Sequence, residues 1–158
     1  LMARLDHHGA VSNLLAEYAA CIDSDDLEAW PAFFTEQAHY RITTEFNHAR
    51  GLPIGIIDAR NRNMMEDRVA SLRQANIYEP QRYRHIISAV RITGNEDRLI
   101  QAEAAFMVVR IMIDGSQELF VTGRYLDQIE LSGETPLFAE KLVVLDSDKI
   151  DTLLAIPL

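Results

Sequence analysis

Five side chains of types that carry general acid–base chemistry stand out in the sequence: Tyr18, Asp23, His39, Tyr40 and His85. A carboxylate, an imidazole and a phenol that face one cavity can move a proton between two positions of a substrate, as an isomerase or dehydratase requires. No spacing rule ties these residues together. The structural interpretation is therefore kept beside the catalytic one: Asp23 follows a helix, where it would cap or turn the chain, and His85 lies within an apolar strand.

The sequence supports redox and metal chemistry less well than acid–base chemistry. Cys21 is the one cysteine, so the chain can form neither an internal disulfide nor a Rieske cluster, which needs two cysteines and two histidines. A facial iron site from His39, His85 and a carboxylate is conceivable, but nothing in the sequence places the two imidazoles together. The sequence lacks the dinucleotide-binding, P-loop, HExxH and GxSxG motifs.

Composition narrows the classes of partner. The chain has 158 residues, which predicts one domain spanning 1–158, and a net charge of −9 argues against nucleic acid and anionic membrane surfaces as partners. No apolar run approaches the roughly 20 residues that cross a bilayer. The single free thiol is typical of a cytoplasmic protein.

Long strands must position any such site. Three runs with strand patterning are separated by turn residues, and they occupy residues 98–113, 118–131 and 136–146. Asp114 and Gly115 predict a type I′ hairpin between the first two runs. Strands this long twist and bend, and Gly123 is a natural point for a bend or bulge. The sequence therefore predicts a strongly curved sheet.

The preceding residues predict helices and shorter strands. Helical spacing covers 11–22, and Asp25 with Glu28 forms a capping-box pattern for a second short helix. Strands are expected at 38–46 and 54–59, a helix capped by Asn61 follows, and a strand over 82–93 ends at a Gly94-Asn95 turn. Helices gathered before antiparallel strands indicate an α+β fold, in which the helices lie against the concave side of the sheet and form a cone. The open end of a cone is a natural pocket.

Two further features suggest a protein partner. The apolar C-terminal stretch 150–158, IDTLLAIPL, must be buried on its own domain or on another chain, and we favour another chain. Five arginines fall on the predicted strands, where they could pair across an interface or within the chain. These are Arg82, Arg84, Arg91, Arg110 and Arg124.

A set of motifs in order along the chain resembles the small, or beta, subunit of Rieske-type aromatic-ring-hydroxylating dioxygenases. The motifs span nearly the whole sequence and are modest singly but specific together. They are Tyr18 with Ile22-Asp23-Ser24-Asp25, Trp30-Pro31-x-Phe33-Phe34, HYRIT, Met65-x-Asp67-Arg68-x-x-x-Leu72-Arg73, Asn76-Ile77-Tyr78-Glu79, Arg82-Tyr83-Arg84-His85, Phe106-Met107-Val108-Val109-Arg110 and the ending Asp151–Leu158.

The resemblance implies a nuclear transport factor two-like, cystatin-like cone and a complex of three large and three small subunits, and it allows a trimer of small subunits. The large subunit would hold the Rieske [2Fe–2S] cluster and a mononuclear Fe(II), while this chain would be structural and supply no catalytic, cofactor-binding or metal-binding residue. The ring substrate would be an aromatic carboxylate similar to terephthalate. The candidate residues for contact with the large subunit are Arg82, Arg84, His85, Arg110, Asp151, Leu153, Leu154, Ile156, Pro157 and Leu158.

Two main hypotheses remain open at this point. One is a non-catalytic assembly subunit of an oxygenase. The other is a stand-alone isomerase or dehydratase that uses Asp23, His39, Tyr40 or His85, and it requires these side chains to line one open, water-accessible cavity. Apolar side chains such as Trp30 filling the cone would exclude it. A small-ligand binding protein without chemistry is a third, weaker alternative.

Overall fold

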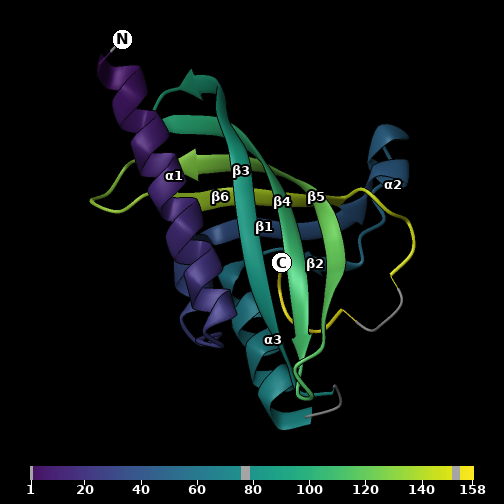
Figure 1. Cartoon of the computed structure of the whole chain (residues 1–158). Helices are drawn as coiled ribbons and strands as arrows, with labels where there is room; N and C mark the ends of the chain where they lie inside the picture. The colour runs from purple at the N-terminus through teal and green to yellow at the C-terminus, as the bar shows by residue number, and fades with distance from the viewer. Residues whose placement is uncertain (1, 76–78, 151–153) are drawn as a thin grey trace.

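The computed structural model describes residues 2–75, 79–150 and 154–158, and it places the helices around one curved sheet (Figure 1). The side chains of residues 2–6 are not described. In chain order the elements are α1 (Met2–Asp23), η1 (Trp30–Phe33), β1 (Phe34–Thr44), α2 (Glu45–Ala49), β2 (Ile57–Ala59), α3 (Arg62–Ala75), β3 (Gln81–Glu96), β4 (Leu99–Met112), β5 (Gln117–Glu130) and β6 (Leu137–Leu145).

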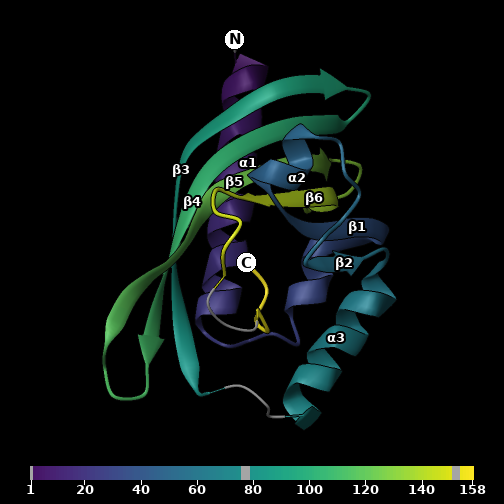
Figure 2. The same cartoon turned by 90° about the vertical axis from the view of Figure 1, so that its right-hand side faces the viewer.

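The sheet has six strands in the order β2-β1-β6-β5-β4-β3. β1 and β6 run parallel, and the other neighbouring pairs run antiparallel. The sheet curls around the interior, α1 crosses its hollow side, and α3 lies at one end (Figures 1 and 2). This arrangement confirms the predicted α+β cone with a mixed, curved sheet.

The two long hairpins are where the sequence predicted them, but their turns differ from the prediction. The β3–β4 turn consists of Asp97 and Arg98, both with positive φ (46° and 69°), as a type I′ turn demands. The expected turn at Gly94-Asn95 is wrong, because these two residues still pair with β4. At the β4–β5 turn only Gly115 has positive φ, and the Met112 N–H donates to Ser116 O at 3.0 Å. The turn is therefore a three-residue loop and not type I′.

Gly123 serves close packing rather than a bulge. A Cβ on Gly123 would collide with the carbonyl oxygen of Val144 and lie 2.9 Å from a ring carbon of Phe106. The register shift in this strand instead falls between Val121 and Leu119, so Phe120 is the extra residue. Irregular pairing also bends β3 near Ala89, which has a φ of 52°.

The predicted helix starting at Asp25 is wrong. Asp25 has a φ of 61°, a left-handed conformation that aspartate tolerates better than most residues, and only a single 3-10 turn, η1, follows. Asp25 and Glu28 do not cap each other. Both bind the guanidinium of Arg73 on α3, at 3.0 Å and 2.7 Å, and so attach this loop to α3.

Two helix starts follow local chemistry. Asn61 caps α3 as predicted, because its Oδ1 accepts the N–H of Met64 at 2.9 Å. The strand expected over 38–46 ends earlier, at Thr44, because the Thr44 hydroxyl accepts the N–H of Asn47 and begins α2.

Candidate functional site

The structure brings two of the five candidate residues, Asp23 and His85, into direct contact. Asp23 is the last residue of α1, and His85 lies on β3 with its side chain fully buried. The Asp23 carboxylate accepts a hydrogen bond from His85 Nδ1 at 2.6 Å and another from the His85 backbone N–H at 2.9 Å. A carboxylate that orients an imidazole in this way is a common element of acid–base sites. Here the other ring nitrogen, Nε2, is buried without a hydrogen-bond partner.

Two further candidates, Tyr18 and Tyr40, meet at a different point of the interior. Both are fully buried, and both hydroxyls donate to the carbonyl oxygen of Leu158, at 2.7 Å and 3.0 Å. The indole N–H of Trp30 donates to the Tyr18 hydroxyl at 3.2 Å. Burial raises the pKa of both phenols, so they remain neutral hydrogen-bond donors.

His39 does not join this group. The alternation of β1 buries Tyr40 and leaves His39 partly exposed, and His39 Nε2 pairs with Asp58 on β2. The iron site from His39, His85 and a carboxylate is therefore excluded by the placement of the two histidines on different sides of the sheet. An acid–base mechanism would need these side chains around one cavity, and they do not converge on one.

The sequence analysis missed a buried ion pair in the cone. Lys141 on β6 and Asp127 on β5 are opposite one another in register, their side chains are at most 1% exposed, and Lys141 Nζ lies 3.1 Å from Asp127 Oδ2. The ammonium also lies 3.5 Å from the centre of the Tyr125 ring. Burial raises the pKa of Asp127 to about 6 and lowers that of Lys141 to about 8, because each charge has lost its water. The sequence did contain a signal for this pair, because each of the two strands carries one charged residue on its otherwise apolar, inward-facing side.

Aromatic side chains fill the interior where an open pocket would have to lie. Tyr18 packs edge-on against Phe138 and Tyr125, and Trp30 packs edge-on against Tyr40. Two grooves on the described surface lie elsewhere. One, of about 520 Å³, runs between α1, η1 and the β5–β6 connection; the other, of about 230 Å³, is lined by both polar and apolar residues, such as Gln101, Gln128 and Leu126. Neither is lined by Asp23, Tyr40 or His85.

The C-terminal residues contribute to this filling. All five residues of 154–158 are buried against their own chain. The sequence left own-domain and partner burial open and favoured a partner; for these residues the structure places the contact within the chain. Asp151 and Leu153 lie outside the described residues.

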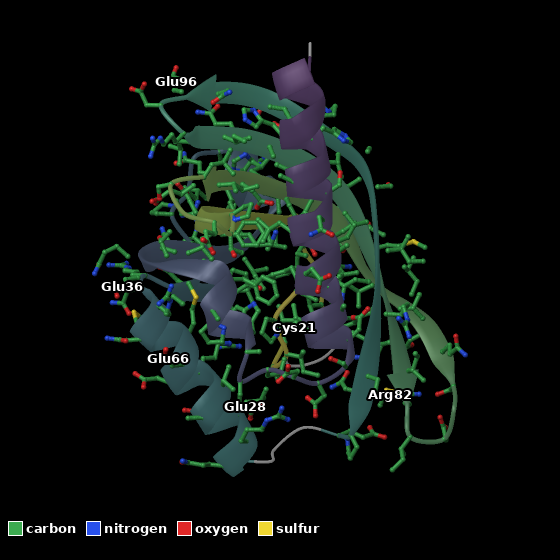
Figure 3. All side chains as sticks on the ribbon, turned by 90° about the vertical axis from the view of Figure 1, so that its left-hand side faces the viewer. Cys21, Glu28, Glu36, Glu66, Arg82 and Glu96 are labelled. Carbon is green, nitrogen blue, oxygen red and sulfur yellow. The ribbon has the colours of Figure 1, made fainter. Side chains whose placement is uncertain are left out.

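Four of the five predicted arginines have a carboxylate partner within the chain: Arg91 with Glu103, Arg110 with Glu118, Arg124 with Glu45 and, at 4.0 Å, Arg84 with Asp23. Arg110 is also buried over the ring of Phe120. Arg82 and Arg84 on β3 are exposed, and Figure 3 places Arg82 across the molecule from α3.

The residues do not fit a Rieske cluster, for which one thiol is too few. In the three described segments, no group of three or more His, Cys, Asp or Glu side chains could hold a metal ion. Cys21 is buried, its Sγ contacts Asp26 O at 3.0 Å, and burial raises its thiol pKa to about 11, which makes it an inert core residue. Among the helices described, none is long and apolar enough to cross a membrane.

Comparison with known proteins gives a consistent result. Residues 17–152 match the family model described as the ring hydroxylating beta subunit. The chain is 45% identical over 143 residues to the beta 1 subunit of the terminal oxygenase component of terephthalate 1,2-dioxygenase from Comamonas sp., covering 90% of this chain and 93% of that protein. It is 38% identical over 141 residues to the small subunit of anthranilate 1,2-dioxygenase from Burkholderia cepacia, covering 89% of this chain and 88% of that one.

A solved structure extends the comparison to the fold. A crystal structure from Novosphingobium aromaticivorans, of a protein assigned as the beta subunit of an aromatic-ring-hydroxylating dioxygenase, superposes with a TM-score of 0.90 at 32% identity. The match covers all of both chains.

Proposed function

This chain belongs to the ring-hydroxylating beta subunit family, and we propose that it is the structural, non-catalytic small subunit of a Rieske non-haem iron dioxygenase. The substrate of the whole enzyme is an aromatic carboxylate similar to terephthalate, as the names of the related terephthalate and anthranilate enzymes suggest. The enzyme works in aromatic catabolism in the cytoplasm. It is an oxidoreductase, and this chain takes part in it as a subunit.

The observation that supports a structural role is the filled interior of the cone. General acid–base catalysis needs groups within hydrogen-bond reach of a substrate, or one water away. Tyr18, Tyr40 and Trp30 instead bind one another and the carbonyl of Leu158, and His85 binds Asp23. These polar groups stabilise the fold, and none of them lines either groove described above.

The redox centres belong, in this proposal, to a large subunit. That chain holds the Rieske [2Fe–2S] cluster and a mononuclear Fe(II), which supply electron transfer and oxygen activation. Three large and three small subunits form the enzyme. The small subunits also contact one another as a trimer.

The proposed contact surface is the outer face of the sheet over β3 and β4. Ile86 and Met107 are opposite one another in register and are 48% and 36% exposed, and Arg84 beside them is 67% exposed at its side chain. An apolar centre with arginines around it is typical of a protein interface. His85, by contrast, points into the core from the same strand. It contributes to the interface by holding the backbone of β3 in place.

Co-expression of this chain with its large subunit tests the proposal. We expect a hexamer that contains iron in the large subunit, while the isolated chain binds no iron and shows no isomerase or dehydratase activity. Stoichiometric iron bound by the isolated chain, or a monomer that turns over a substrate alone, would contradict the proposed role.

A matched pair of variants tests the contact surface. Ile86→Glu places a charge at the proposed interface, and we expect it to reduce hexamer yield. Ile54→Glu is the control, because Ile54 is similarly exposed, at 60%, but precedes β2 at the other end of the sheet. Equal yields from the two variants would exclude this face as the interface.

A further inference from the structure

Residues 154–158, which we term the tail, are bound by their own chain in the manner of a peptide ligand. The hydrogen bonds described for the tail's backbone are all made with side chains of the rest of the chain. The Tyr18 and Tyr40 hydroxyls donate to Leu158 O, and the Leu158 N–H donates to the Tyr40 hydroxyl at 3.0 Å. The Arg68 guanidinium donates to Leu154 O at 3.1 Å. No strand or helix is assigned to the tail.

These side chains come from three separate elements that converge on the tail. Tyr18 is on α1, Tyr40 on β1 and Arg68 on α3. The tail's own apolar side chains, Leu154, Ile156 and Leu158, belong to the hydrophobic core and are at most 5% exposed. Figure 2 shows the C-terminus inside the space that α1, α3 and the sheet enclose.

The polar groups would be left without their partner if the tail were withdrawn. A buried donor that has lost its acceptor carries its full desolvation penalty. The vacated space would be apolar, with two phenol hydroxyls aimed at one end of it and one guanidinium at the other, which is the composition of a ligand pocket.

We propose that the interior of the cone is a binding site for a short apolar peptide, and that the tail is its intramolecular occupant. Specificity comes from the two tyrosine hydroxyls on the carbonyl of Leu158 and from Arg68 on the carbonyl of Leu154. Affinity comes from burial of the leucine and isoleucine side chains. The site is independent of the dioxygenase assembly proposed above.

The test converts the tail into a separate peptide after the complete chain has folded. A protease recognition site is inserted between Asp148 and Lys149, which are exposed, and the purified protein is then cut. A synthetic fluorescent peptide with the sequence of residues 149–158, KIDTLLAIPL, serves as the probe. We expect the two fragments to stay together on dilution, as seen by native mass spectrometry, and the probe to exchange into the site with saturable binding.

Two variants that each remove one buried hydroxyl make the test specific. Tyr40→Phe removes a hydroxyl that binds Leu158, and we expect it to weaken probe binding by about three- to tenfold, the effect of one or two buried hydrogen bonds. Tyr125→Phe is the matched control, because the Tyr125 hydroxyl is buried without a hydrogen-bond partner, and it should leave probe affinity unchanged.

Three outcomes would overturn the proposal. The first is loss of the cut peptide from a core that stays folded, without saturable rebinding. The second is unfolding of the core on cleavage, which would make the tail an inseparable part of the fold. The third is an equal effect of Tyr40→Phe and Tyr125→Phe on probe binding.

Discussion

The carboxylate of Asp23 binds His85 at two points, the ring Nδ1 and the backbone N–H, and so joins the end of α1 to the edge strand β3. Because the two residues are 62 positions apart in sequence, this contact fixes how the helix crosses the sheet. The same pair of residue types can serve catalysis. In this chain the imidazole faces the core, which makes the contact a structural one.

Asp23→Ala tests that structural role. We expect it to lower the free energy of unfolding by about 1.5–3 kcal/mol, the usual contribution of hydrogen bonds to a charged group. Chemical denaturation of the isolated chain measures the change. Asp26→Ala is the control, because the Asp26 side chain is exposed; a loss as large as that for Asp23→Ala would show that the Asp23–His85 contact is not the cause.

The buried Asp127–Lys141 pair predicts a strongly non-additive double mutant. Asp127→Leu and Lys141→Met, made singly, each leave a buried charge unpaired and should cost about 3–5 kcal/mol. The double variant removes both charges and should be close to wild type or more stable. Urea unfolding of the four proteins completes the cycle. If the losses in free energy of unfolding from the two single substitutions simply added in the double variant, the buried pairing would be contradicted.

The same pair predicts the pH dependence of stability. The pKa of Asp127 rises from 3.8 to about 6 on folding, so its contribution to stability is present below 3.8 and is lost as pH rises through 6. The pKa of Lys141 falls from 10.5 to about 8, so its contribution is present above 10.5 and is lost as pH falls through 8. We therefore expect the stability of the wild type relative to the double variant to be lowest between about pH 6 and 8. A pH-independent difference would contradict these pKa shifts.

Gly123→Ala tests the close approach of β5 to its neighbours. The new Cβ would collide with the backbone of Val144 and the ring of Phe106, and we expect a loss of about 3 kcal/mol, at the upper end for overpacking. Gly133→Ala is the control, because no atom lies within 4 Å of its would-be Cβ and its φ is not left-handed. Melting temperatures of the two variants provide the comparison, and equal values would show that β5 can move away at little cost.

The sequence predicted the curved sheet well because strand patterning and turn residues are local signals. The hairpin positions followed from this, as did the cap of α3 by Asn61. The exact turns could not be predicted in this way. A type I′ turn formed at Asp97-Arg98, where tight strand pairing outweighs the backbone preferences of these two residues. Asp25 and Glu28 matched a capping box by spacing alone, but a distant residue, Arg73, binds both.

The interior was harder to predict because it depends on contacts between distant segments. His85 and Asp23 were both candidates, yet nothing in the sequence shows that they touch. Lys141 was overlooked since a lysine within a strand is normally exposed, and only the cross-strand position of Asp127 explains its burial. The burial of the tail is also a tertiary effect, since its apolar composition fits a partner equally well.

The irregular course of β3 near Ala89 has a consequence for how copies of this chain meet. β3 is the last strand of the sheet, and a straight outer strand offers free N–H and C=O groups to any strand that approaches it. The two register shifts between Ser88 and Gly94 interrupt that row of groups, and the exposed side chains of Arg82, Arg84 and Arg91 line it. Continuous sheets built from several molecules are thereby disfavoured, which protects a long β protein from aggregation during folding.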